Sequence, residues 1–349
     1  MEKTMSAQAP AMSMTSASPW ITSRRWDLTW LTLSALLVAV PPLVHTYWKV
    51  GATGVDLLVT LLIGGPHMYA TFLRTVFEPG FRRVHPVLVW TPVVLVPIFV
   101  VSGAVFAFTA LLTFFFTVAS LHVCDQAAYI GYLYREKGGN AKPWERFLDF
   151  SVIAASLYAV AMYRHVAGTF VIGERTLWFP PFLKHEWFAD ACAIAAAALI
   201  AAWAVKTWNQ WRRGEVGAPY LVFMGLTMGV AAIITRIGEL SVAFQGFNAW
   251  HSFQYLGLSF LLLNRAESMG QVTAGFVKQM AQPGKFTRFY GWNILWTLGA
   301  SVLIGILVYF MGLPLEQCYY AVVLSFLLTH YAHDATLFTL GTKASRSSS

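Results

Sequence analysis

Residues 105–134 read VFAFTALLTFFFTVASLHVCDQAAYIGYLY, and Arg135 follows directly. As a helix rising 1.5 Å per residue, this stretch is long enough to cross about 30 Å of hydrocarbon. It carries His122 and Asp125 inside an otherwise apolar segment. Because such side chains are costly in hydrocarbon unless they pair, line a cavity or bind an ion, they indicate a functional site in a membrane protein.

The composition extends this interpretation to the whole chain. Of the 349 residues, 57% are hydrophobic and 11% are charged, whereas a soluble domain carries about 25% charged residues. We therefore predict a polytopic integral membrane protein with no sizeable soluble domain. The net charge of +8 comes mostly from basic residues in short loops, so it indicates topology and no nucleic-acid partner. The three cysteines show no CxxC spacing and suggest no disulfide framework.

The hydropathy pattern predicts an all-α bundle of about ten transmembrane helices. The boundary between the third and fourth spans is the least marked, because only Ser102-Gly103-Ala104 divides them. The predicted spans are Leu28–Tyr47, Val55–Thr75, Pro86–Val101, Val105–Tyr134, Phe147–Phe170, Trp187–Thr207, Pro219–Val242, Phe247–Leu263, Gly291–Met311 and Gln317–Leu340.

The basic residues test this count, because cytoplasmic loops are enriched in Lys and Arg. Arg82, Arg135 and Arg212 represent three of the basic clusters, and these clusters fall in every second loop. The remaining loops hold only Lys49, Arg175 and Lys184. Ten spans with both termini in the cytoplasm satisfy this alternation, and we expect the lipid bilayer of a bacterial inner membrane as the location.

The domain prediction follows from the same pattern. We expect a disordered cytoplasmic N-terminus over residues 1–25, a single transmembrane helical domain over residues 26–340, and a cytoplasmic tail over residues 341–349. The first twenty residues lack an apolar core, so they do not form a signal peptide.

Several histidines lie at one level within these spans. His122 precedes Arg135 by thirteen positions, and His251 precedes Arg265 by fourteen. At 1.5 Å per residue, each imidazole lies roughly 20 Å from its basic marker. His67 and His330 have comparable distances to Arg82 and Lys343, so four helices are expected to bring imidazoles to similar depth.

The last span carries His330, His333 and Asp334. Residues three and four apart share one helical face, so two imidazoles and a carboxylate are expected to meet there. His122 and Asp125 repeat the three-residue spacing. Each carboxylate is either a ligand or a group that orients an imidazole. The alternative for all of these is a set of hydrogen-bonded packing residues. The predicted metal ligands are His67, His122, Asp125, His251, His330, His333 and Asp334.

Other polar residues are assigned to the surroundings of this site. Gln254 follows His251 by one helical turn and is expected to support it. Arg236 and Glu239 lie three apart within the predicted seventh span, as an intramembrane ion pair or as a charged wall of the same cavity. His165 is expected to be an anchor at the membrane interface.

Four blocks resemble those of a group of bacterial multi-span membrane proteins with histidines scattered over several spans. Those multi-span proteins are similar in style to the retinal-forming β-carotene dioxygenases of bacteria and archaea, which look like iron enzymes with histidine ligands inside the bilayer. The chain lacks the Pro-His-Gly-Ala-Leu-Asp word of those dioxygenases and the His-x-x-His-His clusters of membrane desaturases. The blocks are Gly65-Pro66-His67-Met-Tyr-Ala-Thr71-Phe-Leu-Arg74, His122…Gln126…Tyr132-Leu-Tyr134, His251-Ser-Phe-Gln254-Tyr255 and His330-Tyr331-Ala-His333-Asp334.

These observations predict a membrane-embedded oxidoreductase with one or two non-haem iron ions. Imidazole-rich sites suit iron, copper or zinc. A water-poor apolar cavity fits the O2-dependent hydroxylation, desaturation or cleavage of an apolar lipid or isoprenoid, with an electron donor as a possible further partner. The alternatives are an electron-transfer protein with haem on two of these histidines, and a transporter coupled to protons or a metal ion.

Overall fold

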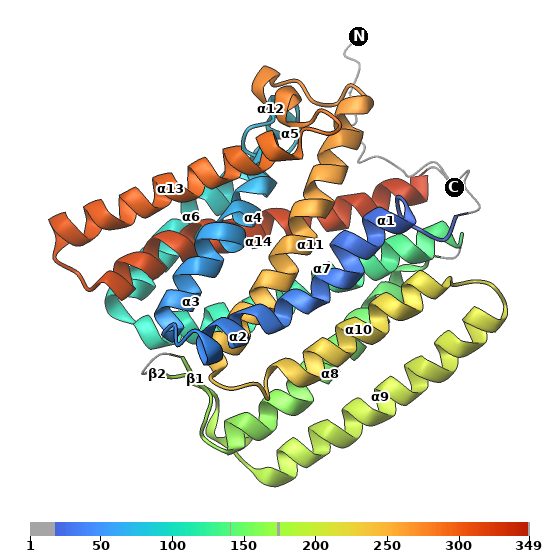
Figure 1. The fold of residues 1–349 in the computed structure, drawn as a ribbon, viewed down its shortest axis with the longest axis horizontal. Helices are drawn as coiled ribbons and strands as arrows, with labels where there is room; N and C mark the ends of the chain where they lie inside the picture. Colours follow the sequence, from blue (N-terminus) through green and yellow to red (C-terminus); the bar gives the residue numbers. More distant parts are fainter. Residues whose placement is uncertain (1–17, 140, 173–174, 348–349) are drawn as a thin grey trace. The chain divides into compact units, whose positions relative to one another are not determined.

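The computed structural model describes residues 18–139, 141–172 and 175–347, and most of the predicted disordered N-terminus lies outside these ranges. The described chain is almost entirely helical (Figure 1). Its strands, β1 (Val171–Ile172) and β2 (Arg175–Thr176), form a short antiparallel hairpin. The described residues cluster into two compact units, of which unit 1 comprises 60–111 and 255–347 and unit 2 comprises 18–59 and 112–254.

Two helices belong to both units, because the boundaries fall inside α7 (Phe108–Lys137) and α11 (Leu240–Ser268). The other helices of unit 1 are η3 (Thr60–Gly64), α4 (Gly65–Ala70), η4 (Thr71–Leu73), α5 (Pro79–Val84), α6 (Pro86–Phe106), α12 (Gly275–Met280), α13 (Phe286–Met311) and α14 (Leu315–Ser347). Those of unit 2 are α1 (Arg24–Asp27), η1 (Leu28–Thr32), η2 (Leu33–Ala39), α2 (Val40–Tyr47), α3 (Ala52–Val59), α8 (Pro143–Val166), η5 (Pro181–Leu183), α9 (Glu186–Arg212) and α10 (Ala218–Ile234).

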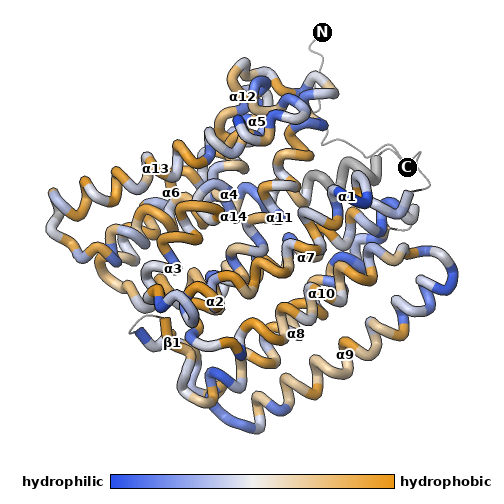
Figure 2. Tube along the Cα trace, viewed as in Figure 1, coloured by the Kyte–Doolittle hydropathy of each residue, from blue (hydrophilic) through white to orange (hydrophobic). Residues whose placement is uncertain are grey.

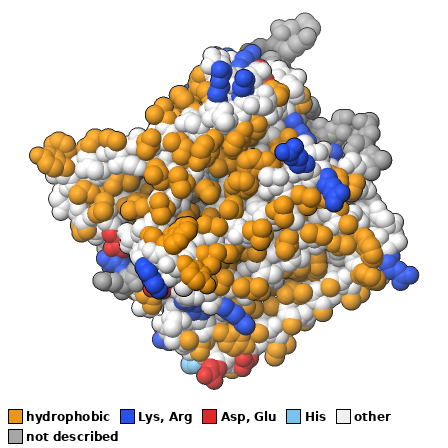
Figure 3. Space-filling model, viewed as in Figure 1, with side chains coloured by type: hydrophobic (Ala, Val, Ile, Leu, Met, Phe, Trp, Pro, Cys, Tyr) orange, Lys and Arg blue, Asp and Glu red, His pale blue; other side chains and the backbone are white. Residues whose placement is uncertain are grey.

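Seven helical segments of the described chain are long and apolar enough to cross a membrane, and α10 is a shorter apolar helix. Figure 2 shows hydrophobic residues along most of α6 and α13, with hydrophilic residues at the connections. In the view of Figure 3, hydrophobic side chains cover much of the surface and few charged ones interrupt them. Only 17% of the apolar window of α6 is buried within the protein, so its surface requires a lipid-like environment. The chain is an all-α integral membrane protein, as predicted.

Each predicted span coincides with a helical segment, with two local differences in the boundaries. The third and fourth spans separate at Ala107, where the backbone leaves the helical region, and not at residues 102–104. Residues 235–239 form the connection between α10 and α11. Helix α10 ends at Ile234, and Gly238 within the connection adopts φ +47°, a conformation that glycine tolerates. Arg236 and Glu239 are therefore exposed side chains of a turn between two helices, and not of one continuous helix as the predicted seventh span has them.

Helix α14 extends to Ser347, and thus into the segment that the sequence assigns to a cytoplasmic tail.

In unit 1, α14 packs against α6 and α13, and α13 packs closely on α4. The close approach depends on Gly65, because a Cβ at this position would overlap the side chain of Thr297 on α13. The sequence Gly64-Gly65-Pro66 also changes the helical geometry, from the π-helical turns of η3 to the α-helical turns of α4. His67 thus projects from a short helix that α13 holds in place.

In unit 2, α8 lies beside both α9 and α10 (Figure 1). A buried charged network joins these helices to α7. Arg135 of α7 is 1% exposed, and its guanidinium binds Asp149 of α8 with an Nε–Oδ2 distance of 3.0 Å. Asp149 also accepts hydrogen bonds from Trp203 and Tyr220, on α9 and α10. The sequence prediction treated Arg135 as a loop residue, and its position inside α7 is a correction. Its buried charge is tolerated because a carboxylate neutralises it.

This network makes a prediction about stability. Replacing Arg135 by Met leaves the Asp149 carboxylate buried without its cationic partner, and breaking a buried ion pair in this way costs about 3–5 kcal/mol. We expect a clearly lowered midpoint of thermal unfolding for the purified protein in detergent. Arg212→Met is the matched control, because Arg212 is exposed at the end of α9. Equal midpoints for the two variants would show that the network does not stabilise the fold.

Candidate metal site

His67 is fixed in one tautomer by its own helix. Its ring is 1% exposed, and Nδ1 lies 2.5 Å from the carbonyl oxygen of Gly64. Since a carbonyl oxygen only accepts hydrogen bonds, Nδ1 carries the proton of the neutral ring. The lone pair is then on Nε2, the nitrogen that would bind a metal ion.

Asp334 is the centre of a second hydrogen-bonded group in unit 1. Its Oδ1 atom accepts hydrogen bonds from the Thr71 hydroxyl at 2.7 Å and from the Tyr255 hydroxyl at 2.6 Å. Thr71 and Tyr255 also contact each other through their oxygens. Asp334 and Thr71 are fully buried, and Tyr255 is 2% exposed. Hydroxyl donors of this kind stabilise the charged form of a carboxylate.

The protons in this group determine the state of His330. Thr71 Oγ1 lies 2.7 Å from Nδ1 of His330. Because the only hydroxyl proton of Thr71 is donated to Asp334, Nδ1 of His330 must be the donor in this contact. The lone pair of the neutral ring is therefore on Nε2, and Nε2 lies 3.6 Å from Oδ2 of Asp334. Two buried acceptors at this separation repel each other unless a cation, either a metal ion or a second proton on the ring, is located between them.

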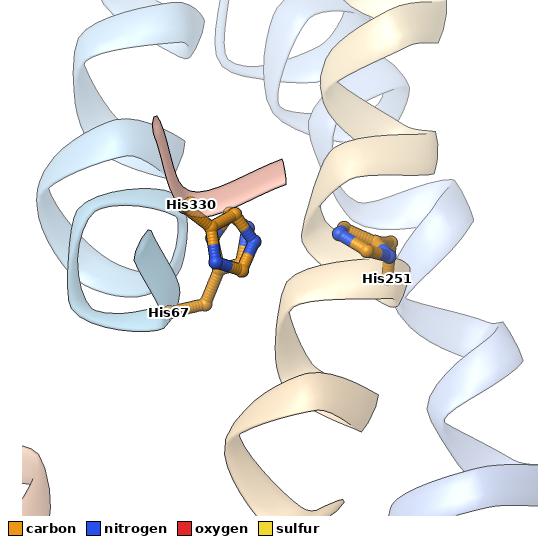
Figure 4. Close-up of side chains that lie close together, drawn as sticks. All are labelled: His67, His251 and His330. Carbon is orange, nitrogen blue, oxygen red and sulfur yellow. The ribbon is translucent and has the colours of Figure 1, made fainter. Parts of the chain in front are cut away.

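His67 and His330 lie together (Figure 4). Their ring centroids are 4.9 Å apart with an interplanar angle of 87°, and a ring nitrogen of each lies within 4.8 Å of the other. Tyr255 packs edge-on against His330, with 4.9 Å between ring centroids. In unit 1, His330 therefore lies between contacts to a second imidazole, His67, and to a carboxylate, Asp334. This donor set suits transition metals, and with open positions it is typical of non-haem Fe(II) oxygenases.

His333, which the sequence places beside His330, has different contacts. Its Nε2 lies 3.0 Å from the carbonyl oxygen of Val89 on α6, and its Nδ1 lies 3.2 Å from Oγ1 of Thr75. The carbonyl requires a proton on Nε2, so this nitrogen is a donor and not a ligand. His333 thus fastens α14 to α6, while His330 one turn away faces Asp334.

Unit 2 contains a second pair of imidazoles. The rings of His122 on α7 and His251 on α11 are edge to face, with centroids 5.1 Å apart. His122 is 8% exposed and His251 is 1% exposed. The side chain of Gln126, one turn after His122, donates to the carbonyl oxygen of His251 at 3.2 Å and joins the two helices at this level. This pair supplies two further candidate ligands.

The remaining predicted residues of unit 2 have partners elsewhere. Asp125 forms an ion pair with Arg146 at 2.7 Å, and its side chain is 35% exposed. Gln254 donates to the carbonyl oxygen of Leu31 at 2.8 Å and so holds α11 against the N-terminal helices. Glu239 lies 3.8 Å from His45 at the surface. The prediction that all seven candidate ligands share one site involves both units, and it stays a prediction.

Thr71 and Tyr255 were not predicted as site residues, although a signal for them exists in the sequence. Thr71 follows His67 by four residues, Tyr255 follows His251 by four, and Asp334 follows His330 by four. This spacing places each pair on one helical face. A polar residue four positions after a buried histidine is therefore a useful criterion, and of these three residues only Asp334 is among the predicted ligands.

Comparisons of this chain with known protein families, with curated proteins and with solved structures found no match.

The position of Thr71 gives a prediction independent of any metal. Thr71→Val keeps the shape of the side chain but removes the hydroxyl that donates to Asp334 and accepts from His330. Leaving such buried groups without a partner costs about 1–3 kcal/mol each. We expect a lower midpoint of thermal unfolding, and Thr329→Val is the control. Thr329 is similarly buried, but its hydroxyl bonds only to backbone carbonyls. A Thr71→Val protein as stable as the control would contradict this role.

Proposed function

We propose that this protein is a membrane-embedded non-haem iron oxidoreductase acting on an apolar substrate. The observation that carries the proposal is the donor set of unit 1, in which His67, His330 and Asp334 are fully or almost fully buried and His330 lies close to each of the other two. Two imidazoles and one carboxylate are the ligands that non-haem Fe(II) oxygenases use, although copper or zinc also bind imidazole. Iron at this site would supply O2 activation, and the reaction class is hydroxylation, desaturation or cleavage.

The residues around the donor set have separate tasks. Thr71 and Tyr255 hold Asp334 through its Oδ1 atom, which leaves Oδ2 directed at His330. The hydrogen bond between His67 and Gly64 fixes the orientation of the first imidazole. Groups behind the ligands that fix tautomer and orientation raise metal affinity. The apolar side chains of the surrounding helices exclude water and favour an apolar substrate. A separate protein or small molecule would donate electrons where the reaction consumes them.

Of the two alternatives, haem fits the imidazole pairs less well. Two histidines that bind one haem iron from opposite faces are separated by the porphyrin plane. The rings of His67 and His330 contact each other edge to face, and so do those of His122 and His251. Neither pair leaves space for a porphyrin between its members. A transporter remains the second candidate, since buried histidines and acids also form ion pathways.

Metal analysis tests the iron proposal. We expect the protein purified in detergent to contain iron by mass spectrometry and to lack a Soret absorption band. His330→Ala removes a ligand, and its iron content should fall at least tenfold at unchanged monodispersity. His333→Gln is the control on the same helix, because a glutamine can still donate to Val89 and the donor set of His67, His330 and Asp334 is unchanged. A His67→Ala/His330→Ala protein with unchanged iron content would refute the site.

The proposed topology has ten spans with both termini in the cytoplasm. It is supported by the alternation of basic loops and by the helices found at each predicted span. Activity reporters fused after Gly214 and after Gly238 distinguish it from other arrangements, because these glycines flank the single helix α10. We expect cytoplasmic activity for the Gly214 fusion and the opposite side for the Gly238 fusion. Reporters on the same side would exclude α10 as a span and with it the ten-span topology.

A further inference from the structure

Unit 2 contains an apolar cavity of about 270 Å³ among α7, α8, the segment after α8, and the adjoining ends of α10 and α11. None of its lining residues is Asp, Glu, Lys or Arg, and six of them are aromatic Phe or Tyr residues. The residues that line the cavity include Thr117, Ser120, Tyr158, Ala161, His165 and Thr235.

Most of the hydroxyl groups on its walls are bound to the protein itself. Ser120 Oγ lies 2.5 Å from the Tyr158 hydroxyl and donates to the carbonyl oxygen of Thr117. Thr117 Oγ1 donates to the carbonyl oxygen of Thr113 at 2.9 Å. These groups offer little to a polar ligand. A ligand in this part of the cavity is therefore a hydrocarbon chain, which gains free energy from each buried methylene.

The end of the cavity at α10 differs in its polar groups. Thr235 Oγ1 and His165 Nε2 are buried and make no hydrogen bond within the described part of the chain. Thr235 is 8% exposed. Both residues line the cavity, and Arg164, the sequence neighbour of His165, donates a hydrogen bond to the carbonyl oxygen of Thr235 at 2.8 Å. A buried polar atom without a partner costs free energy, and a bound ligand with an oxygen atom would offset this cost.

We propose that this cavity binds a medium-length alkyl chain with a neutral oxygen group at one end, such as a primary alcohol. The oxygen hydrogen-bonds to Thr235 and His165, and the chain lies among the aromatic residues. The volume of about 270 Å³ is many times the roughly 10–15 Å³ that a single water molecule needs, so the cavity has room for a chain of several carbons. A carboxylate is disfavoured because the lining residues carry no cationic Lys or Arg to neutralise it.

The site connects to the imidazole pair of the same unit through α11. Phe247 lines the cavity, and His251 follows it by four residues on the same helical face. The chain-binding site rests on unit 2 alone, so it stands or fails separately from the iron proposal.

The test uses radiolabelled 1-decanol and the full-length protein in lipid nanodiscs, with protein-free nanodiscs subtracted. We expect saturable binding of one decanol per chain. Ala161→Leu adds volume inside the cavity and should weaken binding at least tenfold. Ala243→Leu tests the same cavity from α11 in case the first variant does not fold. Ala159→Leu, the same change on α8 at a position outside the lining, should bind like the unchanged protein.

The polar end has its own test. Thr235→Val keeps the side-chain shape and removes one hydrogen bond, so decanol binding should weaken about two- to tenfold. Unlabelled decanol should compete better than decane or decanoate. Equal competition by decane, or decanol binding unchanged in Thr235→Val and in His165→Phe, would refute the polar end. Binding that survives both cavity-filling variants would refute the site as a whole.

Discussion

The Asp334 carboxylate is the group on which the organisation of unit 1 depends. A charged oxygen among apolar helices is stable only when donors or cations surround it. Thr71 and Tyr255 supply two donors, from η4 and α11. His330, on α14 like Asp334 itself, faces the second carboxylate oxygen. Satisfying this one group therefore joins three segments that are distant in sequence. The same arrangement directs the lone pairs of His330 and Asp334 toward each other, which is a geometry suited to a cation.

Hydrogen-bond partners, more than position along a helix, distinguish the histidines of this protein. His330 and His333 are separated by three residues and are both almost completely buried. The backbone carbonyl of Val89 accepts the proton of His333 Nε2, so the lone pair of this ring is on Nδ1, beside Thr75. Thr71 takes the proton of His330 Nδ1 and leaves Nε2 with a lone pair. The accepting oxygen beside each ring thus determines which of its two nitrogens keeps the lone pair and can serve as a ligand.

The buried polar groups of unit 2 lie in two different settings. Arg135 and Asp149 neutralise each other, and neighbouring Trp, Tyr and Gln side chains complete their hydrogen bonds. Such a saturated network is suited to fixing helices and not to binding a ligand. The cavity beside α8 is nearly free of polar partners, except at Thr235 and His165. The contrast separates a region that stabilises the bundle from a region that can accept a hydrophobic molecule.

The sequence by itself determined the class of this protein and most of its helices. Long apolar stretches leave the backbone no stable alternative to helix in hydrocarbon, so helix positions follow from composition. The helix ends themselves follow less closely, because α10 ends at Ile234 and so leaves Arg236 and Glu239 in a turn. The sequence also identified His67, His330 and Asp334 as polar residues that require a partner.

Only the tertiary structure decided which partner each of these residues has. The pairing of Arg135 with Asp149, of Asp125 with Arg146 and of His333 with Val89 joins different helices. Helical periodicity gives the face on which a side chain lies, but not the helix that covers this face. The same limit applies to the cavity of unit 2, because its volume results from how side chains of several helices fail to fill the space between them.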